Sequence, residues 1–300
     1  MTTVSRLATV AAFAVLVAAS SPVALSQAAQ ESSDERQEFL SILARAEKGH
    51  ADAQFNLGSM YDNGEGVAEN DAEAVKWYRL AAGQGNAKAQ VNLGSMYDNG
   101  EGVAENDAEA VRWYRLAAEQ GNADAQVDLG SMYDNGEGVP KNAAEAVRWF
   151  RLAADQGYAK AQFALGFKYN NGVGVPKNDA EALKWYRLAA DQGYASAQYN
   201  LALTYYNGEG VPKNAAEAVK WYRLAAEQGH ANAQYNLGLM YDNGEGVPKN
   251  DAEAYFWWNL AAAQGSAKAK TSRDVAEKEM TREQIFEAQR RAAAWKVKKE

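Results

Sequence analysis

Apolar and small residues return at helical spacing from residue 51 onward. In residues 51–62 they stand four, five and eight residues after Ala53, which places them on one side of a helix. These residues are Ala53, Leu57, Gly58 and Tyr61. Asn-Gly-Glu-Gly at 63–66 then ends the helix, because glycine tolerates the positive φ of a helix terminus.

A second helix is predicted over about residues 71–84. Asn70 precedes it and Glu73 follows at capping-box spacing, while Gly85 occupies the usual position after a helix. Its inward side carries Ala74, Trp77, Tyr78, Ala81 and Ala82. Small residues allow close helix approach, and the aromatic rings fill the space beside them. The two segments therefore predict an antiparallel helix pair.

This pair is one copy of a 36-residue repeat that covers residues 51–266 six times. We call the first helix of each copy helix A, the second helix B, and number places from the alanine that opens the copy. The copies open at Ala51, Ala87, Ala123, Ala159, Ala195 and Ala231. A period of this length predicts stacked units, since one unit cannot bury its apolar face alone.

Six of the eight tryptophans recur at place 27: Trp77, Trp113, Trp149, Trp185, Trp221 and Trp257. Such a ladder could stack ligands such as sugars. Because it repeats on an apolar helix side, we interpret it as part of the core.

The repeat resembles the Sel-one-like repeat (SLR), a subclass of the tetratricopeptide-type helical solenoids. The resemblance rests on A-x-A-Q-x-x-L-G-x-x-Y-x-x-G-x-G-V followed by A-E-A-x-x-W-Y-x-x-A-A-x-Q-G. It implies an all-α, right-handed superhelical solenoid of antiparallel helix pairs, with the A helices lining the concave side. It also implies a scaffold that binds other proteins.

The segments outside the repeats have separate roles. Arg6, the apolar run 7–19 and the small residues that follow are typical of a secretory signal peptide, which we place at residues 1–28; an uncleaved membrane anchor is the alternative. We expect a flexible segment at 29–36 and a capping B-type helix at 37–50. Capping helices are expected at 267–300, with Thr281 and Gln284 opening the last one.

Composition limits the possible partners. The net charge of −8 argues against nucleic acid, and the absence of cysteine excludes disulfides and thiolate metal sites. Together with the signal-peptide pattern, this predicts an exported, periplasmic or secreted monomer without stable membrane insertion.

Residues suited to catalysis or metal binding are scarce. The two histidines, His50 and His230, hold equivalent repeat places, five copies apart. The loop 62–66 lacks the alternating oxygen ligands of a calcium loop, and its glycines fit helix termination better. We find no nucleophile motif and expect no cofactor, no metal and no enzyme activity.

If helix A lines the concave groove, places 2, 5, 9 and 12 point into it, and the copies differ at these places. Copies one to three carry mainly small and acidic residues there, and later copies aromatic ones. Exposed aromatics are typical of binding hot spots. The predicted partner site is Phe163, Phe167, Tyr199, Leu203, Tyr206, Tyr235 and Leu239. Sequence drift with extra packing between repeats would explain the same pattern.

The function that we expect is a protein-interaction scaffold or periplasmic regulator that binds a peptide or helix of a partner protein. One alternative is an envelope ligand binder or weak hydrolase acting on peptidoglycan-like or β-lactam ligands. A second alternative is a secreted factor that binds a host receptor. The sequence names neither the partner nor the pathway.

Overall fold

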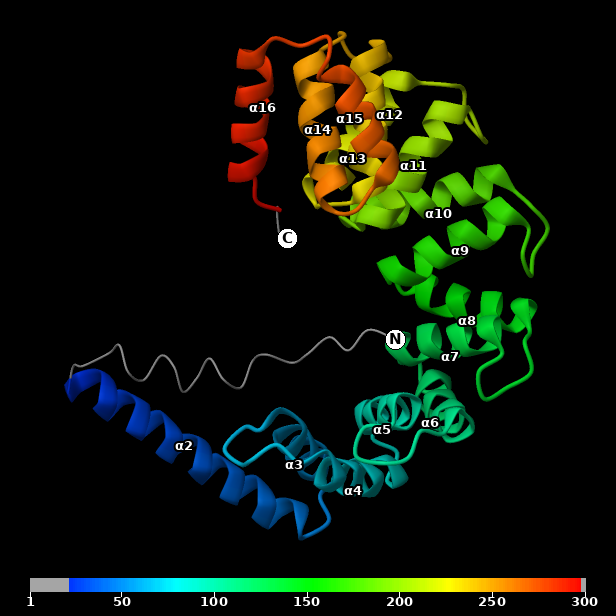
Figure 1. Ribbon diagram of the computed structural model, residues 1–300. Coiled ribbons are helices and arrows are strands. Elements are labelled where there is room, and N and C mark those ends of the chain that lie inside the picture. Colours follow the sequence, from blue (N-terminus) through cyan, green and yellow to red (C-terminus); the bar gives the residue numbers. More distant parts are fainter. Residues whose placement is uncertain (1–21, 298–300) are drawn as a thin grey trace. The chain divides into compact units, whose positions relative to one another are not determined.

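The computed structural model describes residues 22–297, with side chains from Asp34 onward, and within that range every regular element is a helix (Figure 1). The all-α solenoid of tandem helix pairs is confirmed. The chain divides into two compact units, residues 1–120 and 121–300. The predicted leader falls mostly on residues 1–21, outside the described part. Among the described helices, none is long and apolar enough to span a membrane.

Unit 1 contains α2 (Pro22–Ala46), α3 (Ala51–Asn63), α4 (Asp71–Gly83), α5 (Ala87–Asn99) and α6 (Asp107–Glu119). Unit 2 contains α7 (Ala123–Asn135), α8 (Ala143–Asp155), α9 (Ala159–Asn171), α10 (Asp179–Asp191), α11 (Ala195–Asn207), α12 (Ala215–Glu227), α13 (Ala231–Asn243), α14 (Asp251–Ala263), α15 (Ala267–Ala276) and α16 (Arg282–Ala294). From α3 to α14, odd numbers are A helices and even numbers are B helices.

Each A helix packs closely against its own B helix. Leu57 is fully buried, and a Cβ on Gly58 would lie 2.6 Å from a ring atom of Tyr78. Glycine at this place therefore lets the aromatic ring of helix B reach the backbone of helix A. Copy five has Ala202 instead, and it is also fully buried.

The helix ends follow the predicted chemistry with one difference. Gly64 ends α3 with φ of 73°, and the Asn70 side chain accepts a hydrogen bond from the Glu73 N–H at 3.1 Å. The N–H of Asn70, however, donates to the Tyr61 carbonyl at 2.8 Å instead of the Glu73 side chain. The asparagine thus caps helix B with its side chain and bonds helix A with its N–H. Only one of the two hydrogen bonds of a capping box is therefore formed.

Two glutamines per copy join three helices, a feature that the sequence analysis missed. Gln198 is buried, and its Nε2 donates to the carbonyl of Ala190 at the end of α10 (3.2 Å). Its Oε1 accepts from Nε2 of Gln228 at the end of α12 (3.0 Å). The same arrangement recurs in copies one, two, four and six, as Gln90 shows with Ala82 and Gln120. These bonds satisfy buried polar groups and fix the stacking register.

The tryptophan ladder belongs to the core. Trp113, Trp149, Trp185 and Trp257 are buried, and Trp77 and Trp221 are half-buried. The structure thus supports packing over a ligand-stacking array for place 27.

The front end differs from the expected division. Helix α2 runs without a break from Pro22 to Ala46, so it includes residues 29–36, for which the sequence predicted a flexible segment. Its last turns pack on α3 as a B helix would, burying Phe39 and Ala46. The capping helix predicted at 37–50 is therefore the C-terminal part of a longer helix.

The back end is closed by α15 and α16. Helix α16 opens with the predicted capping box between Thr281 and Gln284. It packs against α14, whose place 26 is the buried Phe256 where other copies have an exposed lysine or arginine. Arg291 of α16 restores the missing cation: it lies over the Phe256 ring and bonds Glu253 at 2.6 Å. Side chains of α14 and α16 are thus matched to each other.

Candidate functional site

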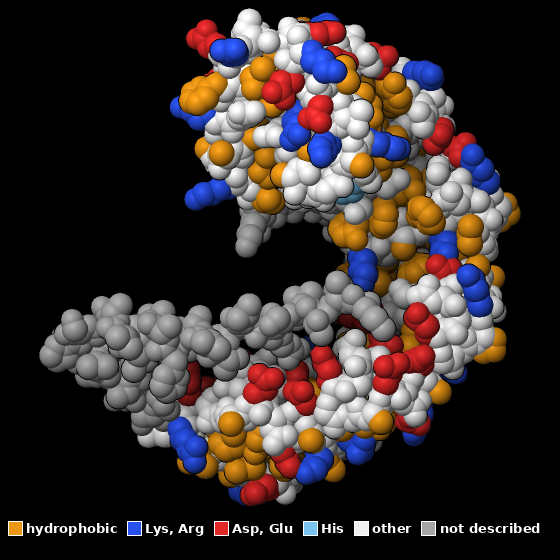
Figure 2. Space-filling view, in the orientation of Figure 1, with side chains coloured by type: hydrophobic (Ala, Val, Ile, Leu, Met, Phe, Trp, Pro, Cys, Tyr) orange, Lys and Arg blue, Asp and Glu red, His pale blue; other side chains and the backbone are white. Residues whose placement is uncertain are grey.

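The seven predicted partner-binding residues all lie in unit 2, on α9, α11 and α13. We call them the aromatic face: Phe163, Phe167, Tyr199, Leu203, Tyr206, Tyr235 and Leu239. Helical spacing brings places 5, 9 and 12 to the same side of each A helix. In the view of Figure 2, hydrophobic side chains gather over the region of α9 to α11.

Only two members of the face are strongly exposed. Phe167 is 47% exposed and Tyr206 is 39% exposed, whereas the other five are half-buried. A large apolar side chain left in water marks a binding surface more directly than a half-buried one. Phe167 and Tyr206 are therefore the candidates for direct contact with a partner.

Place 5 serves packing as well as the surface. The Phe163 ring lies 6.0 Å from the Tyr186 ring of helix B, and Tyr199 lies 5.9 Å from Tyr222. Phe55 in unit 1 makes the equivalent contact with Tyr78 at 5.9 Å. An aromatic residue at this place thus extends the core in both units.

Two further aromatic residues extend the face, and the sequence analysis missed them. Tyr194 packs 5.3 Å from Phe163, and the His230 ring stacks on Tyr199 at 4.7 Å. Both hold place 36, where Asn86 and Asn122 stand in earlier copies. The change from asparagine to an aromatic ring at place 36, together with aromatic place 5, was the available signal.

His230 also caps helix α13. Its Nδ1 accepts a hydrogen bond from the Ala233 N–H at 3.2 Å, so the imidazole must be neutral at that nitrogen. Burial lowers the pKa of His230 below its ordinary value of 6.5. The ring that supports Tyr199 is therefore also a proton-sensitive helix cap.

Polar contacts hold the edge of the face. The Tyr206 hydroxyl donates to Glu245 Oε2 at 3.0 Å, and this bond raises the pKa of Tyr206. Tyr235 is held through its backbone, because its carbonyl accepts from the Trp258 indole N–H at 3.1 Å. Tyr206 thus reaches toward the loop that follows α13.

A buried lysine lies next to Phe167 in the chain. Lys168 takes place 10, where Met60, Met96 and Met132 stand in the first three copies, and its side chain is only 6% exposed. It forms an ion pair with Asp134 of α7. The pair neutralises a charge that would be costly to bury alone.

The described residues offer apolar contact rather than metal chemistry. Among them, no group of three His, Asp or Glu side chains has the geometry to hold a metal ion. The aromatic face instead combines exposed rings with amide side chains such as Asn170 and Asn200. Such a surface can bind a peptide or helix by burying its apolar side chains.

Comparison with known proteins shows the family. The sequence model of the Sel1 repeat matches six consecutive segments: 51–86, 87–122, 123–158, 159–194, 195–230 and 231–266. None of the curated proteins searched matches the chain. Proteins with this repeat generally serve as scaffolds for protein–protein interaction.

Two solved structures are similar to this chain. A Sel1 repeat protein from Oxalobacter formigenes is 36% identical with a TM-score of 0.69, covering 80% of this chain and 94% of that one. The protein c5321, a protective antigen of uropathogenic Escherichia coli with an SLR fold, is 27% identical with a TM-score of 0.49, covering 87% of this chain and 79% of that one. The six matched repeats and the helix pairs that they form make this chain a member of the Sel1 repeat family.

Proposed function

We propose that the protein is a non-enzymatic scaffold that binds a peptide or helix of a partner protein on the aromatic face of unit 2. The observation that carries the proposal is the exposure of Phe167 and Tyr206. Their places carry small or acidic residues in copies one to three, so the repeat fold does not require them there. We place this activity in the periplasm or outside the cell, because the N-terminus is typical of a signal peptide.

A site-specific photocrosslinker tests the position of the partner. The crosslinker replaces Phe167 in one form of the chain and Leu152 in a control form. Leu152 is similarly exposed, at 42%, but lies on helix B of copy three. We expect a specific adduct in the native envelope from position 167 and none from position 152. Equal adducts from both positions would contradict the proposed face.

Substitution then separates binding from folding. Phe167→Ser with Tyr206→Asp converts two exposed places to the residues that copy three carries there. We expect the adduct or the measured affinity to fall at least about tenfold with the helical circular dichroism unchanged. Replacing Tyr199 and Tyr235 by alanine should also weaken binding of the partner. Because both residues are half-buried, thermal melting of this variant must show that it is folded. Unchanged partner binding in both variants would remove the proposal.

The proposed location has its own measurement. Cell fractionation with N-terminal sequencing should recover the chain outside the cytoplasm, beginning near residue 27 or 29. Recovery of the intact N-terminus in the cytoplasm would contradict export without affecting the binding proposal.

A further inference from the structure

The front of unit 1 presents a helix side that lacks its partner. Helix α2 ends as a B helix: Gln54 Nε2 donates to the Ala46 carbonyl at 3.1 Å, as Gln90 does to Ala82. Ile42 is therefore the counterpart of Tyr78, 36 residues later. Tyr78 is completely buried because α3 covers it, whereas Ile42 is only half-buried. Among the described residues, no A helix covers this side of α2.

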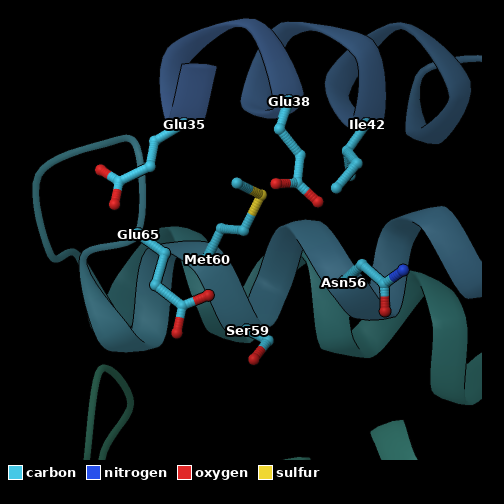
Figure 3. Close-up of a pocket in the computed structure, with 7 residues that line it drawn as sticks. All are labelled: Glu35, Glu38, Ile42, Asn56, Ser59, Met60 and Glu65. Carbon is cyan, nitrogen blue, oxygen red and sulfur yellow. The ribbon is translucent and has the colours of Figure 1, made fainter. Parts of the chain in front are cut away.

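The uncovered side is hollow and acidic. A pocket of about 350 Å³ lies between α2 and α3. Figure 3 shows side chains of α2 pointing toward α3, with Ile42 and Met60 between the two helices. Three carboxylates also line it: Glu35, Glu38 and Glu65. All three residues are exposed, and none has an ion-pair partner among the described residues. The pocket thus offers apolar contact surrounded by negative charge. We call it the front pocket.

The last helix of unit 2 carries the opposite combination. Arg282, Phe286 and Arg290 follow each other at intervals of four, so they form one stripe on α16. All three are exposed, and Phe286, at 68%, is the most exposed of the large hydrophobic residues in the described chain. Arg290 bonds Glu287 on the same helix at 2.8 Å, but an exposed pair of this kind is weak and can be exchanged. We call this the back stripe.

We propose that two copies of this chain associate end to end, with the back stripe of one copy seated in the front pocket of the next. Phe286 enters between Ile42 and Met60, and the arginines face the three glutamates. Charge complementarity selects this occupant: the pocket is acidic, and residues 282–300 contain six basic and three acidic side chains. The sequence alone predicts a monomer, and this proposal departs from it. It is independent of the proposed partner on the aromatic face.

The geometry also predicts the type of assembly. Front and back are different surfaces, so the contact is heterologous and leaves one free front and one free back in every open assembly. Such contacts either form open chains or close into rings, unlike the self-complementary contact of a two-fold dimer. A small apolar contact surrounded by charges further predicts an association that weakens as salt screens the charges.

Sedimentation of the purified protein measures this association. We expect the mean mass to rise with concentration between about 1 µM and about 1 mM at low salt, and to fall when salt is added. Phe286→Ser should weaken the association at least about tenfold. Leu224→Ser is the matched control, because Leu224 is a 44% exposed residue on α12 that belongs to neither surface, and it should change nothing. Circular dichroism and thermal melting verify that both variants are folded.

Mixing two variants identifies the head-to-tail contact. Phe286→Ser keeps a working front, and Glu35→Lys with Glu38→Lys keeps a working back, so each variant alone should remain a single chain. Their mixture should form a one-to-one dimer that does not grow further. A wild-type mass of one chain at every concentration would overturn the proposal. So would association of Phe286→Ser with the wild-type affinity, or a mixture of variants that stays monomeric.

Discussion

The A helices of the two units have the same core and different outer faces. In unit 1, places 9 and 12 are Ser59, Asp62, Ser95 and Asp98, and Figure 2 shows carboxylates along this unit. In unit 2, α9 and α11 carry Phe167 and Tyr206 at these places. Leu57 and Leu201, by contrast, are both fully buried against their B helices. The comparison shows that the stacking residues leave the outer places of helix A free to vary.

The change between faces is gradual within unit 2. Helix α7 still carries Ser131 and Asp134, the residues of unit 1. On the next A helix, the buried Lys168 forms an ion pair with Asp134 and lies beside the exposed Phe167 in the chain. The ion pair thus joins the last acidic place 12 to the first A helix of the aromatic face. The following substitutions measure how strongly the stability of each unit depends on the residues at these places.

The largest effect is expected at this ion pair. Asp134→Asn leaves the Lys168 charge buried without its counter-ion, which should lower the free energy of unfolding by about 2 kcal/mol. The loss stays below that of a fully buried pair because the Asp134 side chain is 28% exposed. Asp62→Asn is the control from unit 1, where Met96 replaces the lysine, and should cost under about 0.5 kcal/mol. Urea denaturation measures both.

A second change verifies the cause of that loss. Lys168→Met in the Asp134→Asn background restores the residue of the earlier copies and should recover most of the stability. Equal losses in Asp134→Asn and Asp62→Asn would show that the two faces do not differ in this respect.

Arg291 tests how the back end of unit 2 differs from an ordinary repeat. Arg291→Ala removes both the ion pair to Glu253 and the cation over Phe256, and should cost about 1 kcal/mol. In unit 1, Arg112 makes the same two contacts within one helix, to Glu109 and Trp113, but is 62% exposed. Arg112→Ala should cost no more than about 0.5 kcal/mol. Thermal melting of both variants shows whether Arg291→Ala lowers stability more than Arg112→Ala, as expected if Arg291 holds α16 against α14.

His230 predicts a loss of stability in acid that belongs to unit 2. Its pKa is lowered in the folded chain, so the unfolded chain takes up the proton first as the pH falls below 6.5, and stability decreases. Protonation also removes the acceptor for the Ala233 N–H, a cap that is typically worth about 1 kcal/mol. His230→Asn should flatten the melting temperature between about pH 7 and about pH 5, since asparagine does not titrate and Asn122 caps α7 in the same way.

The control for this titration lies in unit 1. His50 holds the same place but makes no side-chain cap bond, so His50→Asn is the matched control for the substitution itself. A melting curve whose pH dependence survives His230→Asn would contradict the assignment.

The smallest effect is expected at Tyr206. Tyr206→Phe removes the bond to Glu245 at an exposed site and should change stability by less than about 0.5 kcal/mol. Its effect on partner binding should also be small, because the exposed ring that a partner would contact remains. A loss of stability above about 1 kcal/mol, measured in urea, would instead make Tyr206 a structural residue.

Much of the fold was predictable from local pattern. The helix spans of the repeat, the asparagine caps and the Thr281–Gln284 box follow from spacing and end chemistry, and the structure confirms them. The prediction of a flexible segment at 29–36 differs from the structure, in which these residues belong to the helix Pro22–Ala46. Nothing in the local composition of the segment reveals this helix. The glutamine bonds were also missed, since Gln198 meets Ala190 and Gln228 only after three helices have packed.

The candidate site divides in the same way. Its position on α9, α11 and α13 came from comparing copies, and the chosen binding residues stay a prediction. The exposure of Phe167 and the half-burial of Phe163 could not be separated, because both places face the same side of one helix. Tyr194 and His230 were overlooked because their contacts with place 5 cross between the two ends of a copy.

The sequence by itself determined the repeat, the helix pairs and their caps, because these depend on interactions within about four residues or on a period that can be counted. Tertiary structure decided which repeated places remain exposed, how Lys168 is neutralised by Asp134, and how Arg291 supplies the cation that α14 lacks at place 26. It also decided that α2 leaves an acidic pocket at the front. Burial and charge pairing depend on neighbours far apart in the chain, and these become known only when the helices stack.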